Sequence, residues 1–150
     1  MTRKYWDDLI EGQELQCGQV EFDEAGIIEF AKKYDPQPFH VDEQAARESI
    51  FGGIIASALH TLSACTRVVV EAQGDLAILS GLGMYEATMF NPVRPMDVLS
   101  VEAKWVELKR SRSKPGRGFA GIKCKVFNQN GDPVMEYGYR YLVKCRQNQG

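Results

Sequence analysis

Histidine is scarce in this sequence, with two residues among 150. Three patterns that often carry chemistry are missing: a G-x-S-x-G nucleophile motif, a glycine-rich phosphate loop and a cluster of histidines that would suit a metal. These absences disfavour a serine nucleophile of that type, a loop-bound phosphate and a histidine-rich metal site. Any acid–base chemistry assigned to histidine therefore falls on His40 or His60.

The sequence also lacks a C-x-x-C pair, which argues against a zinc site or a dithiol redox motif. Its four cysteines are widely and irregularly spaced, at Cys17, Cys65, Cys124 and Cys145. The first residues, Met-Thr-Arg-Lys-Tyr-Trp-Asp-Asp-Leu, contain no apolar core of a signal peptide. We therefore expect a cytoplasmic protein whose thiols are reduced packing residues.

A strong excess of one charge is absent as well. The formal net charge is -2 and the pI is about 5.7, whereas nucleic-acid-binding domains usually carry a basic excess. The average conceals an uneven distribution, because residues 1–60 hold 12 acidic and 5 basic side chains and residues 101–150 hold 4 and 11. We expect no nucleic-acid partner, although a polyanionic small molecule remains compatible with the basic half.

Apolar periodicity predicts three helices in the first half of the chain. The first follows the capping residue Asp23 and ends at Asp35, because the residue before a proline is pushed out of helical space. A short helix fits residues 42–48. The longest covers residues 54–73, closes at Gly74 and is apolar or small nearly all round, which is typical of a buried helix.

A membrane span is the rival interpretation of residues 54–73. Polar side chains that make insertion costly are spread through the segment: Ser57, His60, Thr61, Ser63, Thr66 and Arg67. We therefore expect no membrane association.

From residue 77 the apolar period changes to two, which indicates strands with one buried face. With an earlier segment, the expected strands cover residues 15–21, 78–90, 99–105, 122–126 and 135–141. The Asn130-Gly131 step between the last two is a strong hairpin signal. Successive antiparallel strands predict the α+β class, with a curved sheet wrapped around the long helix. Because an open sheet leaves an edge strand, we expect a homodimer or a higher homo-oligomer.

His40 ends a segment that two prolines make rigid, Tyr34-Asp35-Pro36-Gln37-Pro38-Phe39-His40. Such a loop can hold the Asp35 carboxylate and the His40 imidazole toward one water, as a general acid–base pair. A structural role for both residues is the alternative, and spacing alone favours it. His60 lies within the predicted long helix, where we expect a core imidazole satisfied by a nearby partner.

The segment containing Asp35 and His40, followed by Phe51-Gly52-Gly53-Ile54-Ile55-Ala56-Ser57-Ala58-Leu59-His60-Thr61, resembles the signature of the MaoC-like dehydratases. These are hot-dog-fold relatives of the (R)-specific enoyl-CoA hydratases. Their motif is D-x-N-P-x-H, which Asp35, Pro38 and His40 match. Residues 91–97 resemble the family's step between strands, and residues 111–115 resemble a hairpin found in many members. The resemblance implies that residues 1–150 form one hot-dog domain, in which the sheet wraps around the long helix, and that two such domains form a dimer.

The resemblance further implies an activity, the reversible hydration of a trans-2-enoyl thioester to an (R)-3-hydroxyacyl thioester. In that scheme Asp35 and His40 hold the reactive water, and no metal or redox cofactor is required. Coenzyme A or an acyl carrier would belong to the substrate. The acyl chain length and the choice between these two carriers are not encoded in any motif of the chain.

The predicted start of the long helix is suited to stabilise the negative charge that develops on the thioester oxygen, because helix N-termini present free backbone N–H groups. By resemblance, the Ala58 N–H is the oxyanion donor and Ser57 lies beside it. Gly53 would let the ligand approach closely, and Thr66 is a further polar candidate. The plainer interpretation is that Gly52 and Gly53 form a turn and that Ser57 is a small packing residue.

Two residues depart from the family pattern. Gln37 stands where the motif prefers Asn, which alters the hydrogen bonds of the loop without removing the Asp–His pair. Ala58 replaces the usual glycine, so the backbone donor survives while the added methyl group narrows the site. We therefore expect the activity to be retained and the substrate choice to be affected.

Residues 109–117 form a basic stretch with two interpretations. A solvated hairpin tip is the ordinary one. The functional one is a contact between the phosphates of coenzyme A, or of an acyl-carrier prosthetic group, and Arg110, Arg112 and Lys114. RNA binding is disfavoured because no aromatic residue lies among these charges.

The sequence thus favours an enoyl-thioester hydratase. One alternative is a hot-dog acyl-CoA thioesterase, which the D-x-x-P-x-H loop disfavours. The other is a non-catalytic acyl-CoA-binding or assembly module that keeps the loop for structural reasons.

Overall fold

The computed structural model describes residues 2–147, so residue 1 and residues 148–150 of the predicted domain lie outside the described residues. Within that range five antiparallel strands form one sheet, in the order β1-β3-β4-β5-β2. Their bounds are β1 (Glu14–Glu21), β2 (Ile78–Met89), β3 (Val98–Arg110), β4 (Arg117–Phe127) and β5 (Pro133–Lys144). All five predicted strands are present, and the α+β hot-dog fold is confirmed.

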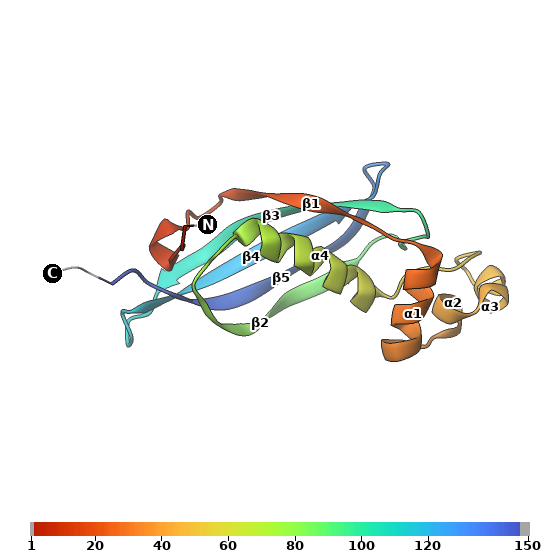
Figure 1. The fold of residues 1–150 in the computed structure, drawn as a ribbon, viewed down its shortest axis with the longest axis horizontal. Helices are drawn as coiled ribbons and strands as arrows, with labels where there is room; N and C mark the ends of the chain where they lie inside the picture. Colours follow the sequence, from red (N-terminus) through yellow and green to blue (C-terminus); the bar gives the residue numbers. More distant parts are fainter. Residues whose placement is uncertain (1, 148–150) are drawn as a thin grey trace.

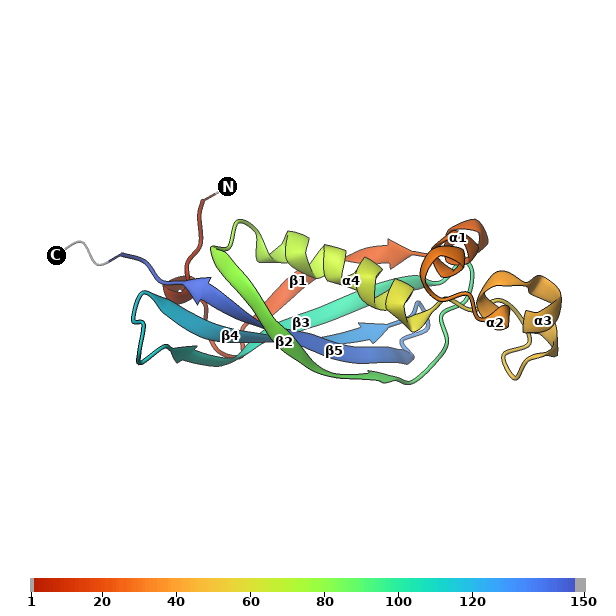
Figure 2. The ribbon, with the colours of Figure 1, turned by 90° about the horizontal axis from the view of Figure 1, so that it is seen from below.

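Helix α4 (Ala58–Gln73) lies along one face of the sheet, which curves beneath it (Figure 1, Figure 2). The helix packs against β1 and β3. Alternate residues of the strands are buried on this face, among them Leu99, Trp105 and Ile122, each at most 2% exposed. Burial of these side chains is the main contribution that stabilises the helix on the sheet. It amounts to roughly 25 cal/mol for each Å² of apolar surface removed from water.

The long helix begins later than the sequence predicts, at Ala58 rather than at residue 54. The preceding residues are buried but lie in no helix or strand, because their backbone groups pair with distant segments. The Ala56 N–H donates to the Val93 carbonyl at 2.8 Å, and the Ile55 N–H donates to the Phe39 carbonyl at 3.3 Å. Ser57 then caps α4 by accepting a hydrogen bond from the Leu59 N–H.

Three shorter helices gather at one end of the sheet, while both termini lie at the other end (Figure 1). As predicted, α1 (Glu24–Tyr34) is capped by Asp23, and a short helix, α3 (Glu43–Glu48), lies in the range 42–48, where Asp42 caps it. The segment between them is not the plain loop that the sequence predicts. It contains a one-turn helix, α2 (Pro38–Val41), because proline at the first helical position has a fitting φ and lacks the N–H that would be unpaired there.

The turn between β4 and β5 follows the predicted hairpin signal. The Asn128 Oδ1 atom accepts hydrogen bonds from the N–H groups of Asn130 and Asp132, both at 3.0 Å. Gly131 has a φ of 80°, a conformation that favours glycine. The prediction of a hairpin at residues 128–132 is confirmed.

All four cysteines are free, and only Cys17 is partly exposed. Burial raises the pKa of Cys65 and of Cys124 to about 12, so these thiols stay protonated and act as packing groups. Within residues 2–147 no three His, Cys, Asp or Glu side chains gather into a group that could hold a metal ion. No helix in the same range is both long and apolar enough to cross a bilayer.

Candidate active site

The structure brings Asp35 and His40 together. Asp35 terminates α1, where its backbone N–H donates to the Ala31 carbonyl at 2.9 Å, and His40 lies on α2. The distance from Asp35 Oδ2 to His40 Nε2 is 3.4 Å. The His40 side chain is 5% exposed and that of Asp35 is 21% exposed, and both line the same cavity. The rigid segment therefore holds a carboxylate and an imidazole at one point.

One hydrogen bond fixes the proton on the His40 ring. His40 Nδ1 lies 2.7 Å from the Ile55 carbonyl oxygen, which can only accept, so Nδ1 carries the hydrogen. In the neutral imidazole Nε2 then presents a lone pair toward the Asp35 carboxylate. A water in the cavity beside these two acceptors can donate one O–H to each of them.

Asp35 itself accepts two hydrogen bonds. The Ser57 hydroxyl donates to Oδ2 at 2.7 Å, and the Gln37 side-chain amide donates to Oδ1 at 2.9 Å. These two bonds, that from Ser57 first, lower the pKa of Asp35 and keep it a carboxylate near neutral pH. Gln37 thus supplies a hydrogen bond to Asp35 despite its departure from the family motif. Ser57, which is fully buried, joins the carboxylate to the start of α4.

Replacing Ser57 by alanine tests this coupling. Because the lost hydrogen bond stabilises the charged form, the Asp35 pKa rises and the acid limb of kcat/KM moves to higher pH. We expect kcat/KM to fall by up to about tenfold on the acid side of its profile, where the two proteins differ in the charge of Asp35, and to change little at neutral pH. The measurement is the pH dependence of kcat/KM for the hydration that the sequence resemblance implies.

The same substitution also removes the cap of α4, so a matched control is needed. Asp23→Ala removes the cap of α1 and costs a similar amount of stability, about 1 kcal/mol. It should lower the melting temperature and leave the acid limb where it is. An unchanged acid limb in Ser57→Ala would show that the hydroxyl does not tune Asp35.

The cavity beside Asp35 and His40 has a volume of about 380 Å³, within the usual range for small-molecule sites. Its lining is mostly apolar and comes from the helical end of the molecule, from α4 and from the segments around β2 and β5. Aromatic rings form one part of the wall, at Phe39, Phe51 and Phe90. A hydrocarbon chain fits this lining, with the polar pair at one point of the wall.

Ala58 also lines the cavity. As the first residue of α4, it has a backbone N–H with no intrahelical acceptor. The residue that carries the predicted oxyanion donor therefore lines the same cavity as the Asp–His pair. Thr61, one turn further along, lines the cavity too and is 2% exposed. The sequence offered no motif for Thr61; only its spacing of three residues from Ala58 on a helix indicates a shared face.

Two other predicted site residues, Gly53 and Thr66, do not line the cavity. Gly53 does not line this cavity but borders a separate hollow with Glu24, Glu43 and Arg47. Its neighbour Gly52 has a φ of 68°, so the glycine pair makes a turn, which is the plainer of the two interpretations.

Thr66 lies further along α4 and outside the cavity lining. Its hydroxyl donates to the Leu62 carbonyl at 2.7 Å and lies 2.8 Å from the Tyr139 hydroxyl. The side chain thus links α4 to β5. The structure gives Thr66 a place in packing rather than at the site.

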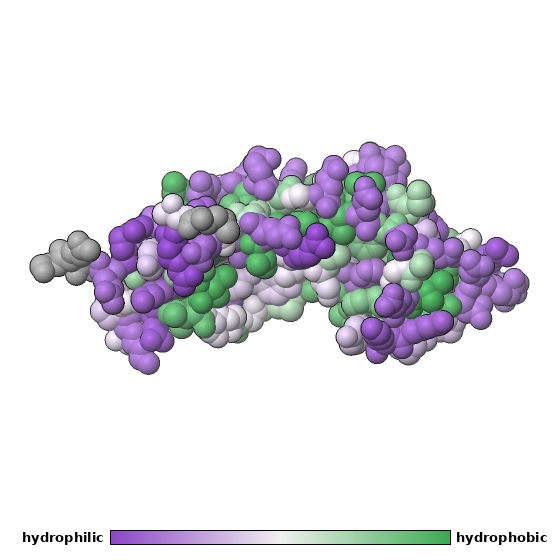
Figure 3. Space-filling view, in the orientation of Figure 1, coloured by the Kyte–Doolittle hydropathy of each residue, from purple (hydrophilic) through white to green (hydrophobic). Residues whose placement is uncertain are grey.

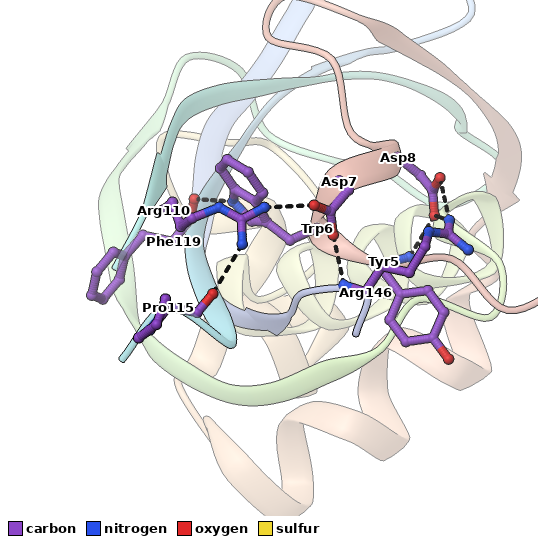
Figure 4. A network of polar contacts seen from close by, with 8 residues as sticks. All are labelled: Tyr5, Trp6, Asp7, Asp8, Arg110, Pro115, Phe119 and Arg146. Atoms are coloured by element: carbon purple, nitrogen blue, oxygen red, sulfur yellow. Dashed lines mark hydrogen bonds and ion pairs between the residues drawn. The ribbon is translucent and has the colours of Figure 1, made fainter. Parts of the chain in front are cut away.

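The predicted phosphate-binding residues lie at the end of the sheet opposite α1–α3 (Figure 1). Arg110 forms an ion pair with Asp7 at 2.6 Å, donates to the Pro115 carbonyl and stacks over the Trp6 ring (Figure 4). Arg112 and Lys114 are exposed at the tip of the β3–β4 hairpin. Within one chain none of these residues reaches the cavity, and Arg110 is already neutralised.

His60 differs in part from its prediction. Its ring packs against Phe22 and Phe30, with centroid distances of 4.8 Å and 4.7 Å, as a core imidazole would. The expected hydrogen-bond partner is absent, since Nδ1 is buried without one among residues 2–147. Aromatic stacking takes the place of polar contacts, and burial lowers the His60 pKa. His60 is therefore a neutral packing residue.

The fold and the site define a hot-dog domain with an acid–base pair at one end of an apolar cavity. The model of the family described as "MaoC like domain" matches residues 10–124. This chain belongs to the MaoC-like domain family, as its motif predicts.

Relatives and solved structures agree with this assignment. The uncharacterized protein YdeM of Bacillus subtilis (strain 168) is 30% identical over 140 residues, which cover 92% of this chain and 97% of YdeM. A crystal structure of the MaoC-like dehydratase from Rhodospirillum rubrum is 36% identical, with a TM-score of 0.87 and coverage of 95% and 98% of the two chains. The R-hydratase PhaJ1 from Pseudomonas aeruginosa shares the fold, with 23% identity, a TM-score of 0.75 and coverage of 95% and 86%.

Proposed function

We propose that this protein is a hydratase/dehydratase that interconverts a trans-2-enoyl thioester and an (R)-3-hydroxyacyl thioester. The observation that carries the proposal is the pair of acceptor atoms, Asp35 Oδ2 and His40 Nε2, which face each other at 3.4 Å on the wall of an apolar cavity. The likeness to the dehydratase from Rhodospirillum rubrum supports it. Coenzyme A or an acyl carrier belongs to the substrate, and the reaction uses no metal or redox cofactor.

In the hydration direction, the water held by Asp35 and His40 attacks C3 of the enoyl group. A bond forms between the water oxygen and C3, and the electron pair of the C2=C3 bond moves toward the thioester oxygen as an enolate. One of the two side chains takes a proton from the water, and the pair returns a proton to C2 as the enolate collapses. The sum of these steps is the addition of one water, with the thioester intact.

The enolate oxygen needs a donor, and the Ala58 N–H supplies it. This group lies at the N-terminus of a helix of 16 residues, where the helix dipole favours negative charge. A preorganised donor of this kind stabilises the intermediate more than the substrate, since the charge on the oxygen grows as the water adds.

Purified protein incubated with crotonyl-CoA tests the proposal. We expect the absorbance of the conjugated double bond to disappear with formation of (R)-3-hydroxybutyryl-CoA, and no free thiol to form. Release of coenzyme A thiol would instead identify a thioesterase. Thermal stabilisation by acyl-CoA without turnover would identify a binding module. Either of these two results contradicts the proposed function.

A further inference from the structure

A basic hollow of about 320 Å³ lies at the end of the sheet opposite the cavity. We define it by three cations, Lys114, Arg117 and Lys144, with Leu79 on its apolar side. Arg117 and Lys144 are directly paired across β4 and β5. Like charges in this arrangement destabilise a sheet unless an anion lies between or beside them.

The cations of the basic hollow differ from the other basic groups at this end. Arg110 and Arg146 are neutralised by Asp7 and Asp8, each at 2.6 Å (Figure 4). No carboxylate among residues 2–147 forms an ion pair with a cation of the basic hollow. A concave surface with three unneutralised cations is suited to a phosphate-bearing ligand.

The two edges of the sheet are unlike each other. The β1 edge carries exposed Glu14 and Glu21, charges that discourage pairing with another chain. The β2 edge is 12 residues long and contains one charged residue, Glu86. Its exposed side chains include Leu79, Leu82 and Met84. Figure 3 shows apolar surface at the lower left, in the region where Figure 1 places the start of β2. The register of β2 with β5 shifts at three points, but its low charge and its exposed apolar side chains fit a second copy of this chain better than the β1 edge does.

Antiparallel pairing of two β2 strands about their midpoint places the two ends of the strand side by side. Leu79 borders the basic hollow, and Met89 lines the cavity. Within one chain these residues lie ten positions apart, about 33 Å along the strand at roughly 3.3 Å per residue. In the pair, Leu79 of one chain lies beside the partner's Met89. The end of the sheet that carries the basic hollow thereby adjoins the end that carries the partner's cavity.

We infer that Lys114, Arg117 and Lys144 bind the phosphate groups of a coenzyme A thioester whose acyl group occupies the cavity of the partner subunit. This inference rests on the proposed function. Of the cations that the sequence predicts to contact phosphate, the inference retains Lys114 and excludes Arg110, which forms an ion pair with Asp7. It adds Arg117 and Lys144 as phosphate contacts. Each site of the dimer then consists of an Asp–His pair from one chain and a phosphate contact from the other.

The first test measures the kinetics of a triple variant with two substrates. The variant carries Lys114→Ala, Arg117→Ala and Lys144→Ala. With crotonyl-CoA we expect KM to rise at least tenfold at unchanged kcat. With crotonyl-N-acetylcysteamine, which has no phosphate, KM should not change. A control variant, Lys104→Ala, Lys109→Ala, Lys125→Ala, removes the same charge from exposed positions outside the basic hollow. It should behave as the wild type with both substrates. Equal changes for both substrates, or none for crotonyl-CoA, would overturn the inference.

The second test asks which chain the basic hollow serves. Heterodimers of the triple variant and Asp35→Asn are purified with two different tags. Their one active site has the intact Asp–His pair of the triple variant and the intact basic hollow of the other chain. We expect the KM for crotonyl-CoA to return to the wild-type value. A KM that stays high, or a failure of the wild-type chain to dimerise, would overturn the arrangement.

A direct binding measurement separates failure of this inference from failure of the proposed function. If the wild type turns over no enoyl thioester, the proposed function fails. Calorimetric titration with coenzyme A then still reports on the basic hollow, and we expect at least tenfold weaker binding in the triple variant than in the control variant. Equal affinities in the two variants would overturn the inference whatever the activity.

Discussion

Asp35→Asn and His40→Ala should each lower kcat for crotonyl-CoA hydration by about 10³-fold, within the range that general acid–base groups contribute. The first substitution would keep the shape of the side chain but lose the charge that the Ser57 and Gln37 hydrogen bonds stabilise. The second would remove the Nε2 acceptor and the contact with the Ile55 carbonyl. Steady-state kinetics with crotonyl-CoA measure both effects.

Each of these variants has a matched control in the same chain. Asp23→Asn makes the same chemical change at a helix cap, where asparagine is an equally good capping residue. His60→Ala removes the other histidine, which packs against Phe22 and Phe30 away from the cavity. Both controls should keep kcat, although His60→Ala will lower the melting temperature. Wild-type activity in Asp35→Asn or in His40→Ala would refute the assignment of the pair.

Ala58→Pro is expected to lower kcat by about 10²- to 10³-fold, the usual effect of removing one oxyanion donor. Proline deletes the backbone N–H and suits the first position of a helix, so α4 should form normally. The preceding residue, Ser57, already has a ψ of 140°, in the extended region that a following proline requires. Kinetics and the melting temperature of the variant together make the measurement.

The control for Ala58→Pro is Ala58→Gly, which keeps the donor and restores the residue that the family prefers. It should retain kcat, at a modest cost in helix stability of under about 1 kcal/mol. A rise in KM alone in Ala58→Pro would show that the proline ring only obstructs the cavity. Retention of full kcat there would contradict a role of this N–H in catalysis.

Local chemistry explains why part of the site could be predicted from the sequence. Pro36 ends α1 at a known residue, and Pro38 starts the next turn, so the separation of Asp35 and His40 is set within seven residues of sequence. The capping residues and the Asn130-Gly131 turn act over similarly short distances. Signals of this kind can be read without knowing the rest of the fold.

Long-range pairing explains what the sequence did not predict. Residues 54–57 have a helical composition. The Val93 and Phe39 carbonyls accept hydrogen bonds from the N–H groups of Ala56 and Ile55, which keeps this segment out of the helix. The proton on the His40 ring depends on the Ile55 carbonyl, which no side-chain motif marks. Likewise, which cations of the β3–β4 hairpin are neutralised depends on Asp7, about a hundred residues earlier in the chain.

One measurement tests the central claim, that this site adds a water to C3 of an enoyl thioester. Crotonyl-CoA is incubated with the protein in water labelled with oxygen-18, and the products are analysed by mass spectrometry and chiral separation. We expect one labelled oxygen in the C3 hydroxyl group of (R)-3-hydroxybutyryl-CoA, with the thioester intact. Label in a free carboxylate, or no incorporation at all, would contradict the account.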